Sequence, residues 1–237
     1  WVVFQGCSFA PFSISIIYHN LAFEKSFNNY FMNDIAGVIL SGGLSQRMGT
    51  NKALLKIDDK TLIEILYERI SSIFGKIVIS TNSPEDYDFL KLDKIKDVYP
   101  NLGPLSGIHS TLSVLDVEKI FVVSCDNPFI TTSLINHLLR IKTDELIVVP
   151  KAEGIIHYSI GIYSKKLLPI AEQVLNANFI AKRLYEEKKS FFFSMKNFIE
   201  RVGAEVVDVE NEKFYFNDLF FNMNTPEDFE YVKEKLF

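Results

Sequence analysis

The stretch "IAGVILSGGLSQRMGTNKALL" (residues 35–55) decides the fold that the sequence predicts. The apolar run from Ile35 to Leu40 is typical of a buried strand. A loop with three glycines and two cations, Arg47 and Lys52, follows it directly. Glycines let the backbone approach a ligand closely and turn its amides toward an anion, and cations add positive charge there. The stretch therefore favours a phosphate-binding loop over the alternative, a surface loop with incidental cations.

Two common phosphate-binding motifs do not fit this loop. A Walker A motif has the spacing G-x-x-x-x-G-K-[ST], whereas Gly43 and Gly49 are too far apart and a Thr-Asn pair precedes Lys52. A Rossmann fingerprint has the spacing G-x-G-x-x-G and runs straight into a helix, which Gly42 and its neighbour do not provide. What remains is a long glycine-bearing loop from which Arg47 and Lys52 project.

Composition places the chain among ordinary globular proteins. Of its 237 residues, 48% are hydrophobic and 23% are charged, which is enough apolar material for one sizeable core. The net charge of -5 and the lack of an aromatic and basic stripe argue against nucleic acid or an anionic membrane as partners. Cys7 and Cys125 form neither a disulfide framework nor a metal-binding pair, so we expect reduced thiols and a cytoplasmic protein.

Residues 1–31 are expected to be an N-terminal extension outside the domain. Pro11 interrupts this aromatic and apolar segment, and polar residues arrive before about 20 apolar residues accumulate, so it is a poor membrane span. It shows no steady period of either 3.6 or 2 residues. Met32 stands directly before the first convincing strand, and we predict one domain over residues 32–237.

Strands and helices alternate along this domain. The expected strands are residues 35–40, 76–80, 94–98, 119–124, 145–150, 155–163, 203–209 and 218–223. The expected helices are 61–73, one from Pro84, one ending near Leu115, one capped by Thr131 or Thr132, 166–175, 179–188 and one after Thr225. The alternation indicates a single α/β domain with a mainly parallel sheet flanked by helices. Such a sheet binds ligands in loops at the carboxyl ends of its strands.

Four motifs appear in order along the chain. They are "VILSGGLSQRMGTNKALL" (38–55), "DVYPNLGPLSGI" (97–108), "CDNPFI" (125–130) and "NMNTPEDF" (222–229). With these motifs the chain, from Met32 onward, resembles the molybdenum cofactor guanylyltransferases, the MobA-type branch of the nucleotidyltransferases. The resemblance implies a Rossmann-like, GT-A-like nucleotidyltransferase fold, and residues 1–31 have no counterpart in it.

The resemblance also implies an activity. Such enzymes transfer the GMP moiety of GTP to the phosphate of the molybdopterin cofactor, which forms molybdopterin guanine dinucleotide and pyrophosphate. It implies Mg²⁺ as cofactor, GTP and molybdopterin as substrates, and molybdoenzymes or their chaperones as further partners. Membrane and nucleic acid are not among the partners that we expect.

The roles of individual residues follow from their places in the motifs. By resemblance, the nucleotide lies against Leu40, Ser41, Gly42 and Gly43, with Asn82 and Asp97 near the guanosine. Arg47 and Lys52 are expected to hold the phosphates and to stabilise charge as pyrophosphate leaves. Asp126 is expected to hold Mg²⁺, which favours one or two carboxylates together with phosphate oxygens and waters.

The acceptor side is expected at the fourth motif. Asn222 and Asn224 lie two residues apart in an expected strand, so their side chains share one face, and the resemblance places them toward molybdopterin. His157 falls at a family position that is usually followed by proline, yet Tyr158 stands there, and a packed or exposed histidine is the alternative. A basic pair, Lys188-Lys189, could meet the pterin phosphate or simply end a helix.

Three readings of the sequence remain open. The nearest rival is a cytidylyltransferase or a sugar-phosphate nucleotidyltransferase, because these share the fold and the metal. Gly43 favours GTP, since the CTP-using relatives resemble L-A-A-G at this point. A protein that binds nucleotide without catalysis is the third reading, and Arg47, Lys52 and Asp126 argue against it. For Cys125 we expect a packing role.

Overall fold

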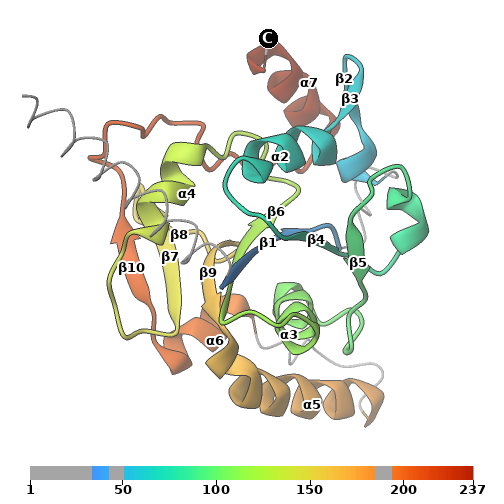
Figure 1. Ribbon diagram of the computed structural model, residues 1–237, viewed down its shortest axis with the longest axis vertical. Helices are drawn as coiled ribbons and strands as arrows, with labels where there is room; N and C mark the ends of the chain where they lie inside the picture. The colour runs from blue at the N-terminus through green and yellow to red at the C-terminus, as the bar shows by residue number, and fades with distance from the viewer. Residues whose placement is uncertain (1–33, 43–50, 185–193, 237) are drawn as a thin grey trace, which may run out of the picture.

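The computed structural model describes residues 34–42, 51–184 and 194–236, and Figure 1 shows their arrangement around one central sheet. Within these residues the sheet has eight strands in the order β10-β7-β9-β6-β1-β4-β5, and β8 pairs with β7. The strands are β1 (Ile35–Leu40), β4 (Ile77–Ser80), β5 (Asp93–Ile95), β6 (Lys119–Ser124), β7 (Ile147–Ala152), β8 (Ile155–Ile156), β9 (Ile160–Ser164) and β10 (Glu205–Asp208). Because β8 and β9 alone are antiparallel to their neighbours, the predicted α/β fold with a mainly parallel sheet is confirmed.

The carboxyl ends of four adjacent strands finish in one row. Leu40 of β1 lies opposite Ser80 of β4 and Ser124 of β6, and Ser80 lies opposite Ile95 of β5. Backbone hydrogen bonds extend the row by one residue, from the amide of Ser41 to Ser80 (2.9 Å) and from the amide of Cys125 to Leu40 (3.0 Å). The loops that leave these strands therefore start side by side.

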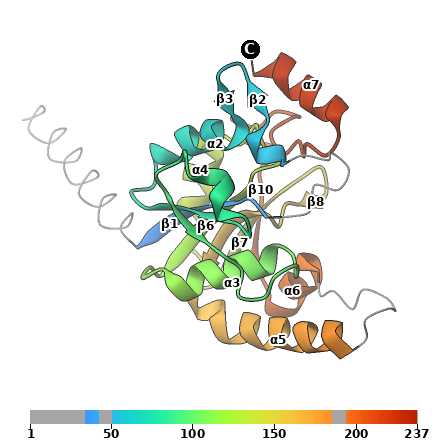
Figure 2. The same cartoon turned by 90° about the vertical axis from the view of Figure 1, so that its right-hand side faces the viewer.

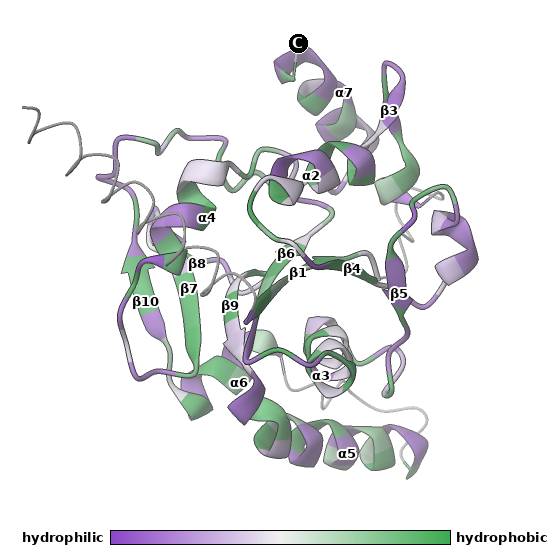
Figure 3. Cartoon of the chain, in the orientation of Figure 1, coloured by the Kyte–Doolittle hydropathy of each residue, from purple (hydrophilic) through white to green (hydrophobic). Residues whose placement is uncertain are grey.

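Helices cover both faces of the sheet. Helices α2 (Leu62–Ser71) and α4 (Thr132–Leu139) lie on one face, and α3 (Pro104–Val114), α5 (Leu168–Leu184) and α6 (Met195–Val202) on the other (Figures 1 and 2). Alternate residues of β1 face opposite layers, since Val38 packs in a cluster with Ile108 of α3 and Ile39 packs in a cluster with Ile63 of α2. Burial on both faces explains why β1, β6 and β7 read as continuous apolar runs, with β7 mainly green in Figure 3.

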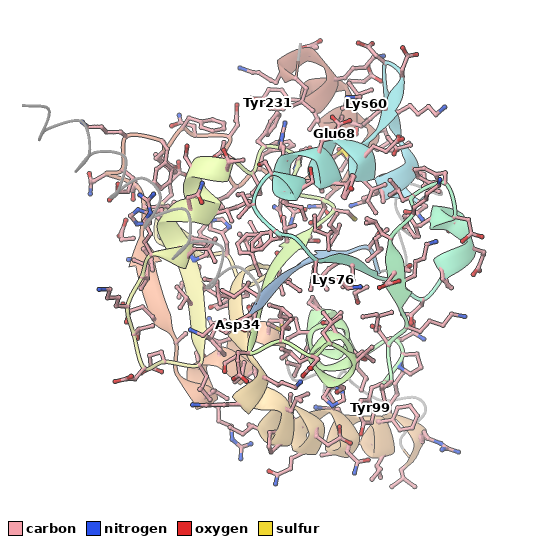
Figure 4. The ribbon with its side chains drawn as sticks, in the orientation of Figure 1. Asp34, Lys60, Glu68, Lys76, Tyr99 and Tyr231 are labelled. Carbon is pink, nitrogen blue, oxygen red and sulfur yellow. The ribbon has the colours of Figure 1, made fainter. Side chains whose placement is uncertain are left out.

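A third packing unit stands at the edge of this arrangement. The hairpin of β2 (Lys56–Ile57) and β3 (Lys60–Thr61) lies beside the last helix, α7 (Pro226–Lys235), in Figures 1 and 2. Buried apolar residues join them, namely Ile57, Leu62, Phe129, Met223 and Val232. A surface ion pair between the hairpin and α2, Lys60 Nζ to Glu68 Oε2 at 2.7 Å, lies on the outside of this unit (Figure 4). Within this unit, Met223 of the segment before α7 packs in one cluster with Phe129 of the loop that follows β6.

The predicted caps start their helices. Thr61 forms a capping box with Glu64 at the start of α2, and Thr225 forms one with Asp228 at the start of α7. The side chain of Thr131 accepts a hydrogen bond from the amide of Leu134 and so caps α4. The described chain also contains three short 3₁₀ helices, η1 (Lys52–Leu54), η2 (Pro84–Tyr87) and η3 (Lys165–Leu167).

Three sequence predictions of secondary structure are wrong. The segment 155–163 is two strands, β8 and β9, because the chain turns between them with a hydrogen bond from Ile160 to His157 O (3.1 Å). The predicted helices 166–175 and 179–188 are one continuous helix up to Leu184, where Asn178 bonds the carbonyl of Val174 (2.8 Å) instead of breaking the helix. The segment 218–223 is a series of turns, with a hydrogen bond from Phe221 to Asp218 O (2.9 Å), although three of its apolar residues, Leu219, Phe220 and Met223, are buried.

Smaller differences concern the ends of elements. The strand predicted at 94–98 ends at Ile95, and the strand predicted at 145–150 begins later, at Ile147. Among the described residues, no helix combines the length and the apolar character that crossing a bilayer requires.

Candidate active site

Polar side chains follow the row of strand ends. Ser41 comes after β1, Asn82 after β4, Asp97 after β5 and Asp126 after β6, and all four strands are adjacent. Leu40 ends β1 with its side chain buried, whereas Gly42 is exposed. A Cβ at Gly42 would meet no described atom within 4 Å, so the described part of the chain leaves open space beside its backbone. The predicted nucleotide-binding residues of the described chain therefore share one edge of the sheet.

Lys52 is held between two of the sequence motifs. It opens η1, whose first turn is capped by the side chain of Asn51, which accepts a hydrogen bond from the amide of Ala53 at 3.2 Å. Its ammonium donates to the carbonyl of Met223 at 2.8 Å and to Oδ1 of Asn224 at 3.0 Å. The fold thus joins the cation of the first motif to the asparagine of the fourth.

The segment before α7 is rigidly hydrogen-bonded. Asp228 accepts from the backbone amides of Asn224 (2.6 Å) and Thr225 (2.8 Å), and Asn224 Nδ2 donates to the carbonyl of Asn222 at 3.2 Å. Those amide bonds, with a smaller contribution from the charge of Lys52, hold the pKa of Asp228 below its usual value. Because this segment is not a strand, the expectation that Asn222 and Asn224 share one strand face is wrong.

Asp126 lies next to the same segment. Its carbonyl accepts a hydrogen bond from the amide of Met223 at 2.9 Å. Its carboxylate oxygen Oδ1 is buried, with no hydrogen-bond partner among the described residues. A buried, unpaired carboxylate oxygen is costly unless a ligand or cation satisfies it. In the described chain Asp126 belongs to no group of three or more metal-binding side chains, so a cation here would take further ligands from a substrate and from water.

Arg69 braces the loop that carries Asp126, and the sequence analysis missed it. Its guanidinium Nη1 donates to the carbonyl of Pro128 and to the carbonyl of Ile130 (3.3 Å). Burial of this cation lowers the pKa of Arg69. A signal was present, because Arg69 stands beside the buried Ile70 and three residues after the buried Leu66, on the apolar stripe of α2.

Cys125 is packed between these groups. Burial, and then the negative charge of Asp126, raise the pKa of its thiol to about 12, although the hydroxyl of Ser41 and the charge of Lys52 act in the opposite direction. A thiol in such surroundings stays protonated at neutral pH and is a poor nucleophile. The surroundings of Cys125 agree with the packing role expected of it.

Asn82 and Asp97 form a reciprocal pair. Asn82 Nδ2 donates to Asp97 Oδ2 at 3.0 Å, and the amide of Asp97 donates to Asn82 Oδ1 at 3.3 Å. Burial raises the pKa of Asp97, and the hydrogen bond from Asn82 opposes that rise. The α3 helix packs against this pair through Gly107, where a Cβ would lie 2.5 Å from Ser80 Oγ. Only glycine therefore fits there without a shift of its neighbours.

A second network was also missed by the sequence analysis. The hydroxyl of Tyr87, from η2, shares a hydrogen bond with Ser41 Oγ at 2.5 Å and accepts another from Asn51 Nδ2 at 2.8 Å. Asn51 Nδ2 also donates to Asp86 Oδ2 at 3.2 Å. Nothing in the local sequence marks Tyr87, because its partners stand far from it along the chain.

The remaining predicted residues divide into two groups. Gly43, Arg47 and the pair Lys188-Lys189 lie outside the described residues. His157 stacks on Phe220, with ring centroids 3.9 Å apart and 10° between the planes. Burial lowers the pKa of His157 to about 4. His157 is therefore a packed histidine, which is one of the alternatives that the sequence left open.

Comparison with known proteins identifies the family of this chain. The sequence model of the family described as "MobA-like NTP transferase domain" matches residues 37–191. A protein of Clostridium perfringens strain 13, named "probable molybdenum cofactor guanylyltransferase", is 35% identical over 208 residues, which cover 84% of this chain and 96% of that protein. A similarly named protein of Flavobacterium johnsoniae is 34% identical over 190 residues, which cover 79% of this chain and 93% of that one.

Solved structures show the same fold. The molybdopterin-guanine dinucleotide biosynthesis protein A of Archaeoglobus fulgidus superposes with a TM-score of 0.67 at 22% identity, over 85% of this chain and 98% of that one. The 4-diphosphocytidyl-2C-methyl-D-erythritol synthase of Anaerococcus prevotii has a TM-score of 0.53 at 14% identity, over 85% and 97%. The sequence match over most of its length shows that this chain belongs to the MobA-like NTP transferase family.

Proposed function

We propose that this enzyme transfers the GMP moiety of GTP to the phosphate of molybdopterin, with release of pyrophosphate. One observation carries the proposal. The backbone of Met223 joins the two groups that the reaction needs, because its carbonyl accepts from the ammonium of Lys52 (2.8 Å) and its amide donates to the carbonyl of Asp126 (2.9 Å). A cation and a carboxylate from separate motifs are thereby held at one strand edge.

Lys52 is the group that meets the phosphates. An ammonium has three donors, and described residues engage two of them, Met223 O and Asn224 Oδ1. The third donor is left for a phosphate oxygen. As the acceptor phosphate oxygen bonds to the α-phosphorus, the bond between that phosphorus and the bridging oxygen breaks, and negative charge grows on the leaving pyrophosphate. A fixed ammonium stabilises that charge.

Asp126 is the residue that would hold Mg²⁺. Its buried and unpaired Oδ1 fits a hard cation, and the Asp126 loop is held by Arg69 through the carbonyls of Pro128 and Ile130. When bound, the metal would supply positive charge at the α-phosphate. The role of the protein is to present one carboxylate oxygen at a fixed place and to leave the other ligand positions to substrate and water.

The two substrates occupy opposite sides of this centre in the proposal. On one side, Leu40, Ser41 and Gly42 would lie against the nucleotide, with the Asn82 and Asp97 pair near the guanosine. On the other side, Asn224 would face molybdopterin, and its bond to Lys52 would tie the acceptor side to the phosphates. Asn222 contributes its backbone carbonyl to this segment.

The choice of GTP over CTP rests on family membership and on the "LSGG" and "GPLSG" stretches. Calorimetric titration of GTP, CTP, ATP and UTP, each with and without Mg²⁺, tests it. We expect GTP to bind most tightly, and Mg²⁺ to strengthen that binding in the wild type. Equal or tighter binding of CTP would overturn the substrate and would leave the fold untouched.

Three further expectations accompany the function. We expect the enzyme to act in the cytoplasm, and to hand its product to molybdoenzymes or their chaperones. Residues 32–237 are proposed to form the nucleotidyltransferase domain. Residues 1–31 are proposed to be dispensable for catalysis.

A further inference from the structure

One tyrosine hydroxyl is bonded to residues on either side of the predicted phosphate-binding loop. The side chain of Tyr87 is fully buried, and its oxygen lies 2.5 Å from Ser41 Oγ and 2.8 Å from Asn51 Nδ2. Ser41 directly follows β1, and Asn51 directly precedes Lys52. The two partners of Tyr87 therefore stand where the chain leaves the sheet and where the η1 helix begins.

From this arrangement we infer that Tyr87 is a positioning residue of the nucleotide site, an inference that rests on the function proposed above. The Tyr87 hydroxyl fixes the separation between Ser41, on the nucleoside side, and Asn51, which sets the start of Lys52. Bringing two points of a chain together costs conformational entropy. The Tyr87 bonds offset this cost before nucleotide arrives, so binding does not have to do so.

Asn51 transmits this position to Lys52. Its amide is held at both ends, because Oδ1 accepts from the amide of Ala53 (3.2 Å) while Nδ2 donates to Tyr87. The η1 turn that begins at Lys52 is therefore oriented by the same side chain that Tyr87 holds. Phenylalanine fills the same space as tyrosine but cannot accept from Asn51 or bond Ser41.

The hydroxyl of Tyr87 stays neutral between pH 6 and pH 9. Burial raises the pKa of Tyr87, and the hydrogen bonds with Ser41 and Asn51 oppose that rise only in part. Its hydrogen bonds are therefore the same from pH 6 to pH 9. An effect of removing the hydroxyl should not vary with pH in this range.

The first test compares Tyr87→Phe with a matched control, Tyr163→Phe. Tyr163 is equally buried and its hydroxyl donates to the carbonyl of Tyr158, within the core between the sheet and α3. Loss of a buried hydrogen bond that positions two binding groups should raise Kd and KM for GTP on the order of tenfold in Tyr87→Phe, with a smaller change in kcat. Tyr163→Phe should leave Kd and KM unchanged.

Two results would overturn the inference. The first is a Tyr87→Phe enzyme with wild-type Kd and KM for GTP. The second is a fall of kcat at unchanged KM, because that is the pattern of a smaller folded fraction and would follow equally from Tyr163→Phe. Kinetics of both variants at pH 6, 7.5 and 9 complete the comparison, and a strongly pH-dependent difference would also contradict it.

A second test separates this inference from the proposed function. If Tyr87 holds Asn51, then Tyr87→Phe and Asn51→Ala are non-additive, because the second change finds the bond already lost. The free energy of unfolding of both single variants and the double variant, measured without nucleotide, shows this coupling directly. A wild type that does not bind GTP would remove the proposed function, yet a non-zero coupling would still support the bond from Tyr87 to Asn51. Strict additivity would overturn the inference itself.

Discussion

Two clusters of polar groups, one at the strand edge and one between helices α3 and α5, shift the pKa of a carboxylate in opposite directions. Between the helices, Glu172 is bonded by the hydroxyl of Tyr99 (2.5 Å) and lies 2.5 Å from His109 Nε2, and Figure 4 shows Tyr99 beside α5. These bonds, that from Tyr99 first, lower the pKa of Glu172. At the strand edge, burial raises the pKa of Asp97, and Asp126 has a buried oxygen without a partner among the described residues. The Glu172 carboxylate is satisfied within the fold, whereas the Asp126 carboxylate keeps one buried oxygen for which the described residues supply no partner.

The largest effect is expected from Asp126→Asn. The change keeps the shape of the side chain but removes the charge that would hold Mg²⁺, so turnover should fall on the order of 10²-fold or more. Metal-free GTP binding and the melting temperature should change little, because Oδ1 has no partner in the described protein to lose. Steady-state kinetics and calorimetry measure both quantities. The comparison variant Lys52→Ala should weaken both binding and turnover, since its charge meets phosphate in the ground state and in the transition state.

Asp97→Asn should separate stability from binding. Because burial raises the pKa of Asp97, its ionised form is disfavoured in the folded protein, and the free energy of unfolding is lowered as pH rises from 3.8 through the raised value. The amide removes that cost and can still accept from Asn82. At pH 7.5 the melting temperature should therefore stay or rise, while the affinity for GTP falls on the order of tenfold. A lower melting temperature with unchanged GTP affinity would place Asp97 among the structural groups.

Glu172→Gln should show the reverse pattern. The lowered pKa of Glu172 means that its ionised form stabilises the folded state above pH 4.5, and that this contribution is lost as pH falls through the lowered value. The Glu172 carboxylate is half exposed, so solvent screens the effect, and the melting temperature at pH 7.5 should fall by about 2–4 °C or less. GTP affinity should stay at the wild-type value. A loss of affinity as large as that of Asp97→Asn would erase the distinction between the two clusters.

The smallest effect is expected from deleting residues 1–31. The first strand of the sheet, β1, begins at Ile35, and we propose that residues 1–31 lie outside the domain. The melting temperature and the GTP affinity of the shortened chain should match those of the full chain. A large drop in either quantity would assign the segment to the domain.

Local patterns predicted the parts of the molecule that depend on neighbours in sequence. The apolar runs of β1 and β6, the caps at Thr61 and Thr225, and the place of Asp126 after a strand could all be read in short windows. The apolar neighbours of Asn222 and Asn224 predict a strand. In the structure Leu219, Phe220 and Met223 are buried, but they lie in turns. Burial alone does not distinguish the two conformations.

The hydrogen-bond partners of Arg69 and Tyr87 could not be predicted in this way. Arg69 bonds backbone carbonyls of a loop that lies 59 and 61 residues away, and Tyr87 bonds Ser41 across 46 residues. Backbone carbonyls carry no mark in the sequence, and the tyrosine sits in a short 3₁₀ turn with no periodicity of its own. Such supporting groups become visible only when the strand ends are brought together.

The most direct test of the central claim is a transfer assay with the wild-type chain. The enzyme would receive molybdopterin, Mg²⁺ and equal concentrations of GTP and CTP, each labelled at its α-phosphate, and the dinucleotide product would be identified by mass spectrometry. We predict molybdopterin guanine dinucleotide, with one pyrophosphate released for each label incorporated. A cytosine dinucleotide as the main product, or nucleotide binding without any transfer of label, would contradict the account.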